Sequence, residues 1–98
     1  MKKPIYADFM ETDYKGRIVL NNDRTFADLA AGGFWLEEGM ALVFYTEDYD
    51  EDGNPRTAVV EGVTEYDLDS ERWVVRIDWD AIKSVSALSA DEKTQLGF

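Results

Sequence analysis

The chain contains no cysteine and no histidine among its 98 residues. Without cysteine there is no disulfide framework, no thiolate nucleophile and no thiolate metal ligand. Without histidine the chain lacks the side chain that most often acts as a general base near neutral pH and most often binds metal ions. These absences favour a protein that is not an enzyme and carries no cofactor.

Long apolar runs are also missing. No segment approaches the ~20 apolar residues that a membrane helix requires. The opening Met1-Lys2-Lys3 is followed by Pro4-Ile5-Tyr6-Ala7-Asp8, and not by the apolar stretch of a secretory signal. The sequence therefore predicts a cytoplasmic protein with no membrane partner.

Basic residues are scarce. Lysine and arginine total 10 against 21 aspartates and glutamates, a formal net charge of −11. Because binding to a phosphate backbone depends on a basic footprint, we expect no nucleic-acid partner. Between Glu47 and Glu71 the only base is Arg56, so a nearly neutral scaffold carries an acidic middle. The acids of this middle are Glu47, Asp48, Asp50, Glu51, Asp52, Glu61, Glu65, Asp67, Asp69 and Glu71.

The remaining composition supports one folded domain. The chain is 45% hydrophobic and 13% aromatic, which is too apolar for a disordered segment, and its length suits one core. We predict a single β-barrel domain over residues 1–98. The pattern Ser89-x-x-Glu92 is that of a capping box, and it predicts a loosely ordered C-terminal helix within residues 89–98.

Alternating apolar residues indicate the strands. In the segment 72–79 one face would carry Trp73, Val75, Ile77 and Trp79, which is typical of a strand with one buried face. Gly62 interrupts a second alternating segment and predicts a bend there. Strands are predicted at residues 5–10, 17–21, 41–47, 57–66, 72–79 and 84–88.

These elements predict a small, partly open β-barrel of five or six antiparallel strands. One short helix is expected near residues 25–31, capped by Thr25, and a short helical turn near 80–83. The order of long strand, hairpin, helical turn and final strand resembles the layout of SH3-like barrels. Residues 41–45, Ala-Leu-Val-Phe-Tyr, are not the Ala-Leu-Tyr-Asp-Tyr box of the peptide-binding SH3 family. The resemblance therefore implies a fold and not that family's proline-rich ligand.

The acidic residues should collect at two turns, 48–55 and 67–71. In a meander these turns lie at opposite ends of one strand, roughly 30 Å apart, which exceeds the ~8 Å screening length at physiological salt. We therefore expect two separate acidic poles, an arrangement that disfavours mimicry of a continuous phosphate backbone.

The first acidic turn also resembles the start of a calcium loop. Asp48, Asp50 and Asp52 alternate before Gly53, and hard cations need oxygen ligands on alternate residues. The twelfth position of such a loop, where a glutamate is required, is Val59. A solvated hairpin tip is the favoured interpretation, with weak Ca²⁺ binding at Asp48, Asp50 and Asp52 as an alternative.

The aromatic residues outnumber the core positions that alternation offers. Phe44, Trp73 and Trp79 are assigned to the core, so some of Tyr14, Trp35, Tyr45 and Tyr49 should reach the surface. Tyrosine and tryptophan anchor interfaces and hold cations on their faces. The sequence therefore predicts a non-catalytic module that binds a basic or mixed protein partner through Trp35, Tyr45, Tyr49, Glu47 and Asp50.

Two other functions stay open. An acidic chain of this size suits an immunity-like or antitoxin-like inhibitor that covers a basic enzyme. The acidic turn suits a weak divalent-cation-binding domain. The sequence leaves the identity of the partner and the oligomeric state open.

Overall fold

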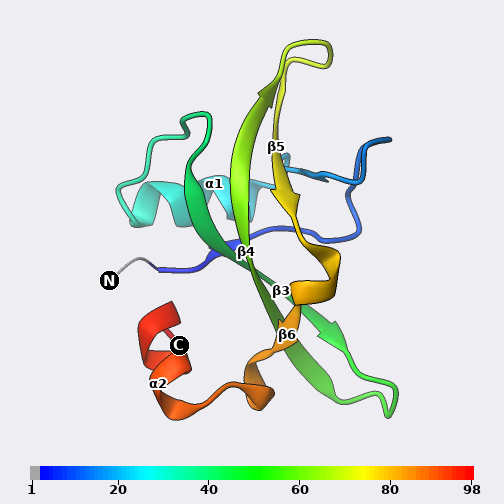
Figure 1. Cartoon of the computed structure of the whole chain (residues 1–98), viewed down its shortest axis with the longest axis vertical. Helices are drawn as coiled ribbons and strands as arrows, with labels where there is room; N and C mark the ends of the chain where they lie inside the picture. The colour runs from blue at the N-terminus through cyan, green and yellow to red at the C-terminus, as the bar shows by residue number, and fades with distance from the viewer. Residues whose placement is uncertain (1–2) are drawn as a thin grey trace.

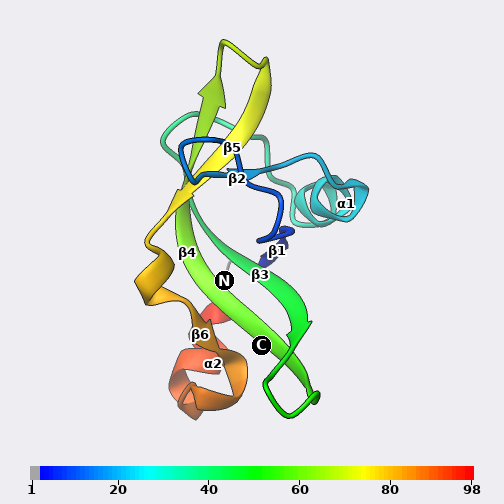
Figure 2. The ribbon, with the colours of Figure 1, turned by 90° about the vertical axis from the view of Figure 1, so that its right-hand side faces the viewer.

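A computed structural model describes residues 3–98 and shows a curved sheet flanked by short helices (Figures 1 and 2). The strand order is β1-β3-β4-β5-β2, and β6 pairs with β4. The strands are β1 (Ile5–Tyr6), β2 (Ile18–Val19), β3 (Ala41–Tyr49), β4 (Pro55–Asp67), β5 (Arg72–Ile77) and β6 (Lys83–Ser84). The helices are α1 (Asp23–Ala31) and α2 (Ala90–Leu96), and the 3₁₀ turns are η1 (Trp79–Ala81) and η2 (Val85–Ala87).

The prediction of a small, partly open β fold is confirmed, with one correction to strand direction. Strands β3, β4 and β5 form the predicted antiparallel meander. Strand β1 instead pairs in parallel with β3, through Ile5 opposite Phe44, so the sheet is mixed and does not close into a barrel. The chain passes through β2 and α1 before reaching β3, which provides the long crossover that parallel pairing requires.

Gly62 is the point at which β4 changes partners. Residues 62–67 of β4 pair with β5, whereas Ala58 and Val59 pair with β6, and β4 curves between them (Figure 2). A Cβ atom on Gly62 would lie 2.4 Å from Val75 Cγ1 and 2.9 Å from Ile77 Cγ2. The glycine therefore allows β5 to pack closely against β4, which bends as the sequence predicted.

Helix α1 begins earlier than predicted, and Thr25 does not cap it. Asn22 is the N-cap, and its Oδ1 accepts the Arg24 N–H at 2.8 Å. The buried Thr25 hydroxyl instead donates to the Tyr6 carbonyl at 2.6 Å, and Asp28 Oδ2 accepts the Tyr6 N–H at 2.9 Å. Two helix side chains thus satisfy the outer backbone groups of β1, which protects a sheet edge that would otherwise be exposed.

We expect Thr25→Val to lower the free energy of unfolding by about 1–2 kcal/mol, because the Tyr6 carbonyl would lose its partner in a buried position. Urea denaturation measures the change. Thr94→Val is the matched control, since the Thr94 hydroxyl bonds to Ala90 O on an exposed helix. Equal stability of the two variants would show that α1 does not hold the edge of β1 through Thr25.

The core lies between the sheet, α1 and the N-terminal segment. It is centred on Phe44, as predicted, with Ile5, Ile18, Leu42 and Val75. The assignment of Trp79 to the core is wrong: 42% of its surface is exposed, because β5 ends at Ile77 and η1 turns the chain outward. Trp73 is partly buried against the core.

The C-terminal part is helical from residue 85 onward, except for short links. Of the predicted strand 84–88, only Ser84 lies in a strand, β6, because Val85–Ala87 form η2. The predicted capping box is confirmed: the Ser89 hydroxyl accepts the Glu92 N–H at 3.1 Å, and the Glu92 carboxylate accepts the Ser89 N–H at 3.2 Å.

Candidate binding surfaces

The guanidinium of Arg24 lies over two tyrosine rings. Its Cζ atom is 4.5 Å from the ring centroid of Tyr6 and 5.6 Å from that of Tyr45. Its Nη2 donates to Glu47 Oε1 at 2.9 Å and to the Tyr45 hydroxyl at 3.2 Å. We call Tyr6, Arg24, Asp28, Tyr45 and Glu47 the Arg24 cluster. Two predicted partner-binding residues, Tyr45 and Glu47, therefore already hold a cation from their own chain.

Ionisation in the Arg24 cluster follows from these contacts. The hydrogen bond from Arg24 holds the pKa of Glu47 below its ordinary value. Burial raises the pKa of Tyr45 despite the hydrogen bond from Arg24, and its hydroxyl donates to Asp28 Oδ2 at 3.2 Å. Near neutral pH the cluster thus pairs a carboxylate and a neutral phenol with the guanidinium.

The end of the β3–β4 hairpin, residues 47–57, carries two further predicted partner-binding residues, Tyr49 and Asp50. Tyr49 is the last residue of β3, and 71% of its surface is exposed. A shallow pocket of about 360 Å³ lies beside it, lined by Glu47, Asp48, Tyr49, Pro55, Arg56 and Thr57. Within residues 3–98, Asp50, Glu51 and Asp52 at the tip form no ion pair. We call residues 47–57 the hairpin end.

The carboxylates of the predicted cation loop have separate partners. Asp48 accepts both Nε and Nη2 of Arg56, at 2.9 and 2.7 Å, and this hydrogen bonding lowers the pKa of Asp48. Asp50 Oδ1 accepts the backbone N–H groups of Asp52 and Asn54 at 3.0 and 2.9 Å. In the part of the chain that the structure describes, no three acidic side chains are grouped so as to hold a metal ion. Asp48, Asp50 and Asp52 are therefore not assembled into a cation site.

Trp35 lies apart from the hairpin end. It belongs to the loop between α1 and the start of β3, whereas Tyr49 ends that nine-residue strand. With 84% of its surface exposed, Trp35 borders an apolar groove of about 390 Å³ against α1. The groove is lined by Phe26, Leu29, Ala30, Gly33, Phe34, Trp35 and Leu36. The structure therefore does not combine Trp35 with Tyr45 and Tyr49 into one surface.

A second groove, which the sequence did not predict, opens on the inner face of the hairpin end. Its volume is about 440 Å³, and it lies between the segment 6–10 and η1. Met10 and Trp79 stand at its rim with 88% and 42% of their surfaces exposed. We call this the open groove; it is lined by Tyr6, Asp8, Phe9, Met10, Thr46, Glu47, Asp48, Arg56, Ala58, Trp79 and Ile82.

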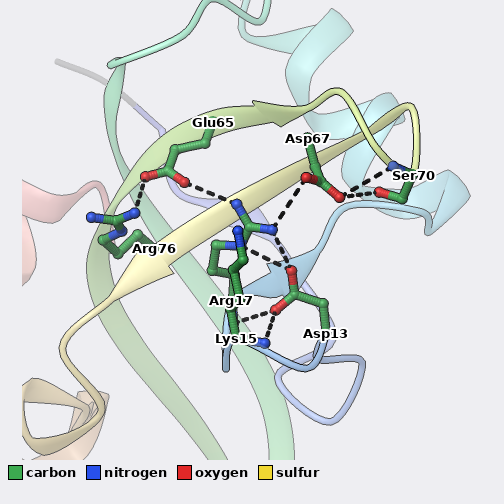
Figure 3. A network of polar contacts seen from close by, with 7 residues as sticks. All are labelled: Asp13, Lys15, Arg17, Glu65, Asp67, Ser70 and Arg76. Carbon is green, nitrogen blue, oxygen red and sulfur yellow. Dashed lines mark hydrogen bonds and ion pairs between the residues drawn. The ribbon is translucent and has the colours of Figure 1, made fainter.

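Three acids near the second turn, Asp13, Glu65 and Asp67, are instead tied to Arg17 (Figure 3), whereas Asp69 and Glu71 form no ion pair within residues 3–98. The buried Arg17 guanidinium contacts Asp13 at 2.7 Å, Glu65 at 3.1 Å and Asp67 at 3.5 Å. Arg76 binds the other oxygen of Glu65 at 2.7 Å. This Arg17 network joins the turn before β2 to the end of β4, so these carboxylates support the fold and are not available to a partner.

Comparisons with protein-family models, curated proteins and solved structures found no match for this chain. Across residues 3–98 no helix has both the length and the apolar character needed to span a membrane.

Proposed function

We propose that this domain is a non-catalytic protein-interaction module whose hairpin end binds a basic partner. The observation that carries the proposal is the exposure of Tyr49 beside three tip carboxylates that have no cation partner in the described residues. An exposed tyrosine supplies apolar contact area at low entropic cost, and unpaired carboxylates attract lysine and arginine. Together they match a surface with basic and apolar groups.

The charge distribution supports this site over the opposite turn. The two acidic turns lie at opposite ends of the molecule (Figure 1), whose longest extent is 38 Å. At the turn after β4, Asp67 is engaged by Arg17 and by the Ser70 hydroxyl, which leaves Asp69 and Glu71 as the two acids there without an ion pair in the described residues. At the hairpin end, three acids (Asp50, Glu51 and Asp52) form no ion pair within residues 3–98 and lie next to the exposed Tyr49.

The ionisation of the acids supports a binding role over a catalytic one. Every carboxylate whose pKa departs from its ordinary value is lowered, at Asp13, Glu47, Asp48, Asp67 and Glu92. A general acid near neutral pH needs the opposite shift. The lowering comes from partners within the chain, such as Arg24 at Glu47 and Arg56 at Asp48, so these carboxylates are not set up as proton donors.

Affinity capture from the organism that makes the protein tests the proposal. The double variant Tyr49→Ala/Asp50→Asn is expected to reduce recovery of the partner at least about tenfold, because both the apolar anchor and a tip charge are removed. Tyr14→Ala is the control, since Tyr14 is at least as exposed as Tyr49 but lies on the turn before β2. Equal recovery of the same proteins by all three baits would refute the hairpin end as the binding surface.

The inhibitor alternative predicts a different salt response. An interface made mainly of opposed charges weakens steeply between low and physiological salt, whereas a tyrosine-anchored contact keeps most of its affinity. If the captured partner is an enzyme with a basic active surface and the complex dissociates steeply with salt, the domain is an inhibitor.

A further inference from the structure

The open groove is formed by two segments that diverge from the hairpin. The N-terminal segment follows β3 as far as Ala7, whose N–H donates to Tyr45 O at 2.9 Å. It then turns away at Asp8, whose Oδ1 accepts the Met10 N–H at 3.0 Å and whose carbonyl accepts the Glu11 N–H at 3.0 Å. Strand β3 continues to Tyr49, so beyond Tyr45 its edge on this side has no paired strand in the described part of the chain.

The apolar rim of the open groove is fixed in position. The Trp79 indole N–H donates to Gly16 O at 2.9 Å, which holds the ring beside the opening. Below it, Thr46 and Ala58 form a buried floor, and Phe9 is also buried. Met10 places its side chain almost entirely in water, although it stands beside these apolar groups. A ligand that covers Met10 and Trp79 would remove apolar surface from water without rearranging the fold.

The charge of the groove selects a cation. Its lining contains three acids and one base, and Arg56 is neutralised by Asp48. Glu47 is paired with Arg24. Among the three lining acids, Asp8 alone forms no ion pair within residues 3–98. The Met10 N–H already orients its Oδ1 atom.

We infer that the open groove takes a lysine or arginine side chain from an extended segment of the partner. The aliphatic stem lies on Met10 and Trp79, and the cationic end meets Asp8 and the indole face. A groove of about 440 Å³ exceeds one side chain and accommodates the flanking residues of a short segment. This inference rests on the proposed function. It places a basic side chain of the partner against the same β3–β4 hairpin.

The test uses the peptide acetyl-Gly-Val-Lys-Val-Gly-amide, titrated into the full chain and followed by nitrogen–proton NMR. We expect saturable shifts of the Trp79 indole N–H and of the Asp8 and Met10 amides. Asp8→Asn keeps the oxygen that accepts the Met10 N–H but removes the charge, and it should weaken binding at least about fivefold. Replacing the peptide lysine with norleucine should have the same effect. Asp69→Asn, at the opposite turn, should leave the affinity unchanged.

Several outcomes would overturn the inference. They are no saturable shift up to about 5 mM peptide, shifts confined to residues 49–54, or unchanged affinity in Asp8→Asn. Equally tight binding of free n-butylamine, which has the lysine stem and its single ammonium group but no peptide backbone, would also overturn it. Each of these leaves the proposed function standing if capture still depends on Tyr49 and Asp50. Capture that ignores Tyr49 and Asp50 refutes the proposed function whatever the peptide does.

Discussion

Arg17→Met is expected to lower the free energy of unfolding by about 3 kcal/mol at pH 7, because it leaves buried carboxylates without their counter-charge. The Arg17 side chain is only 9% exposed and those of Asp13 and Asp67 are 4% and 12% exposed. Methionine keeps the apolar stem, so the variant removes the charge and its hydrogen bonds with little loss of packing. Urea denaturation followed by tryptophan fluorescence measures the change.

The pH dependence of this loss identifies its cause. Burial raises the pKa of Asp13, but hydrogen bonds from Arg17 and from the Lys15 backbone outweigh it, so the pKa lies below its model-compound value of 3.8. A lowered folded pKa contributes stability that is fully present above 3.8 and is lost as the pH falls through the folded value. The difference between wild type and Arg17→Met should therefore shrink as the pH falls below 3.8.

Arg24→Met provides the matched control for Arg17→Met. Arg24 also pairs with a carboxylate, but its side chain is 46% exposed, and exposed ion pairs contribute less than about 1 kcal/mol. If the two variants lose the same stability, or if the loss in Arg17→Met is the same at pH values below 3.8 as at neutral pH, the Arg17 network does not stabilise the fold through charge.

Gly62→Ala is expected to lower the free energy of unfolding by about 2–3 kcal/mol, because the added methyl group overpacks the core at the bend. The new Cβ would lie 2.4 Å from Val75 Cγ1, and Val75 is a fully buried, β-branched residue with no free space to rotate into. Relief requires β4 and β5 to separate, which weakens the pairing of Gly62 with Ile77.

Thermal and urea unfolding of Gly62→Ala measure this cost. Glu61→Ala, on the exposed outer face of the same strand, should change stability by less than about 0.5 kcal/mol. A Gly62→Ala variant as stable as Glu61→Ala would mean that β4 does not need the close approach of β5 at residue 62.

The features predicted from sequence are those that local chemistry determines. Alternation around Val75 predicted β5, turn residues such as Gly53 and Asn54 predicted the hairpins, and Ser89 with Glu92 predicted the start of α2. Gly62 predicted the bend because a strand tolerates glycine poorly unless close packing requires it. These signals lie within a few residues of the structure they determine.

Predictions that depended on distant partners were incomplete. Thr25 has the chemistry of a helix cap, but Tyr6, far away in sequence, uses its hydroxyl. The parallel pairing of β1 with β3 is not encoded in either strand. Trp79 continued the alternation of β5 in sequence, yet the backbone leaves the strand before it and orients the ring to Gly16.

The candidate site follows the same division. Alternation left too few core positions for the aromatic residues, so the sequence predicted that some of Tyr14, Trp35, Tyr45 and Tyr49 would be exposed; the structure exposes all of them except Tyr45. The pairing of Tyr45 and Glu47 with Arg24 depends on how α1 crosses β1, and the open groove depends on where the chain leaves β3 after Ala7. Neither has a local sequence pattern, so Arg24, Asp8 and Met10 were missed.

A photo-crosslinking side chain at the hairpin end tests the central claim most directly. With p-benzoylphenylalanine in place of Tyr49, irradiation in lysate should join the chain to a basic protein, and the yield should fall when Asp50→Asn is added. The same side chain in place of Tyr14 should give no such product. Crosslinking to the same protein from position 14 alone, or equally from both positions, would contradict the assignment of the hairpin end.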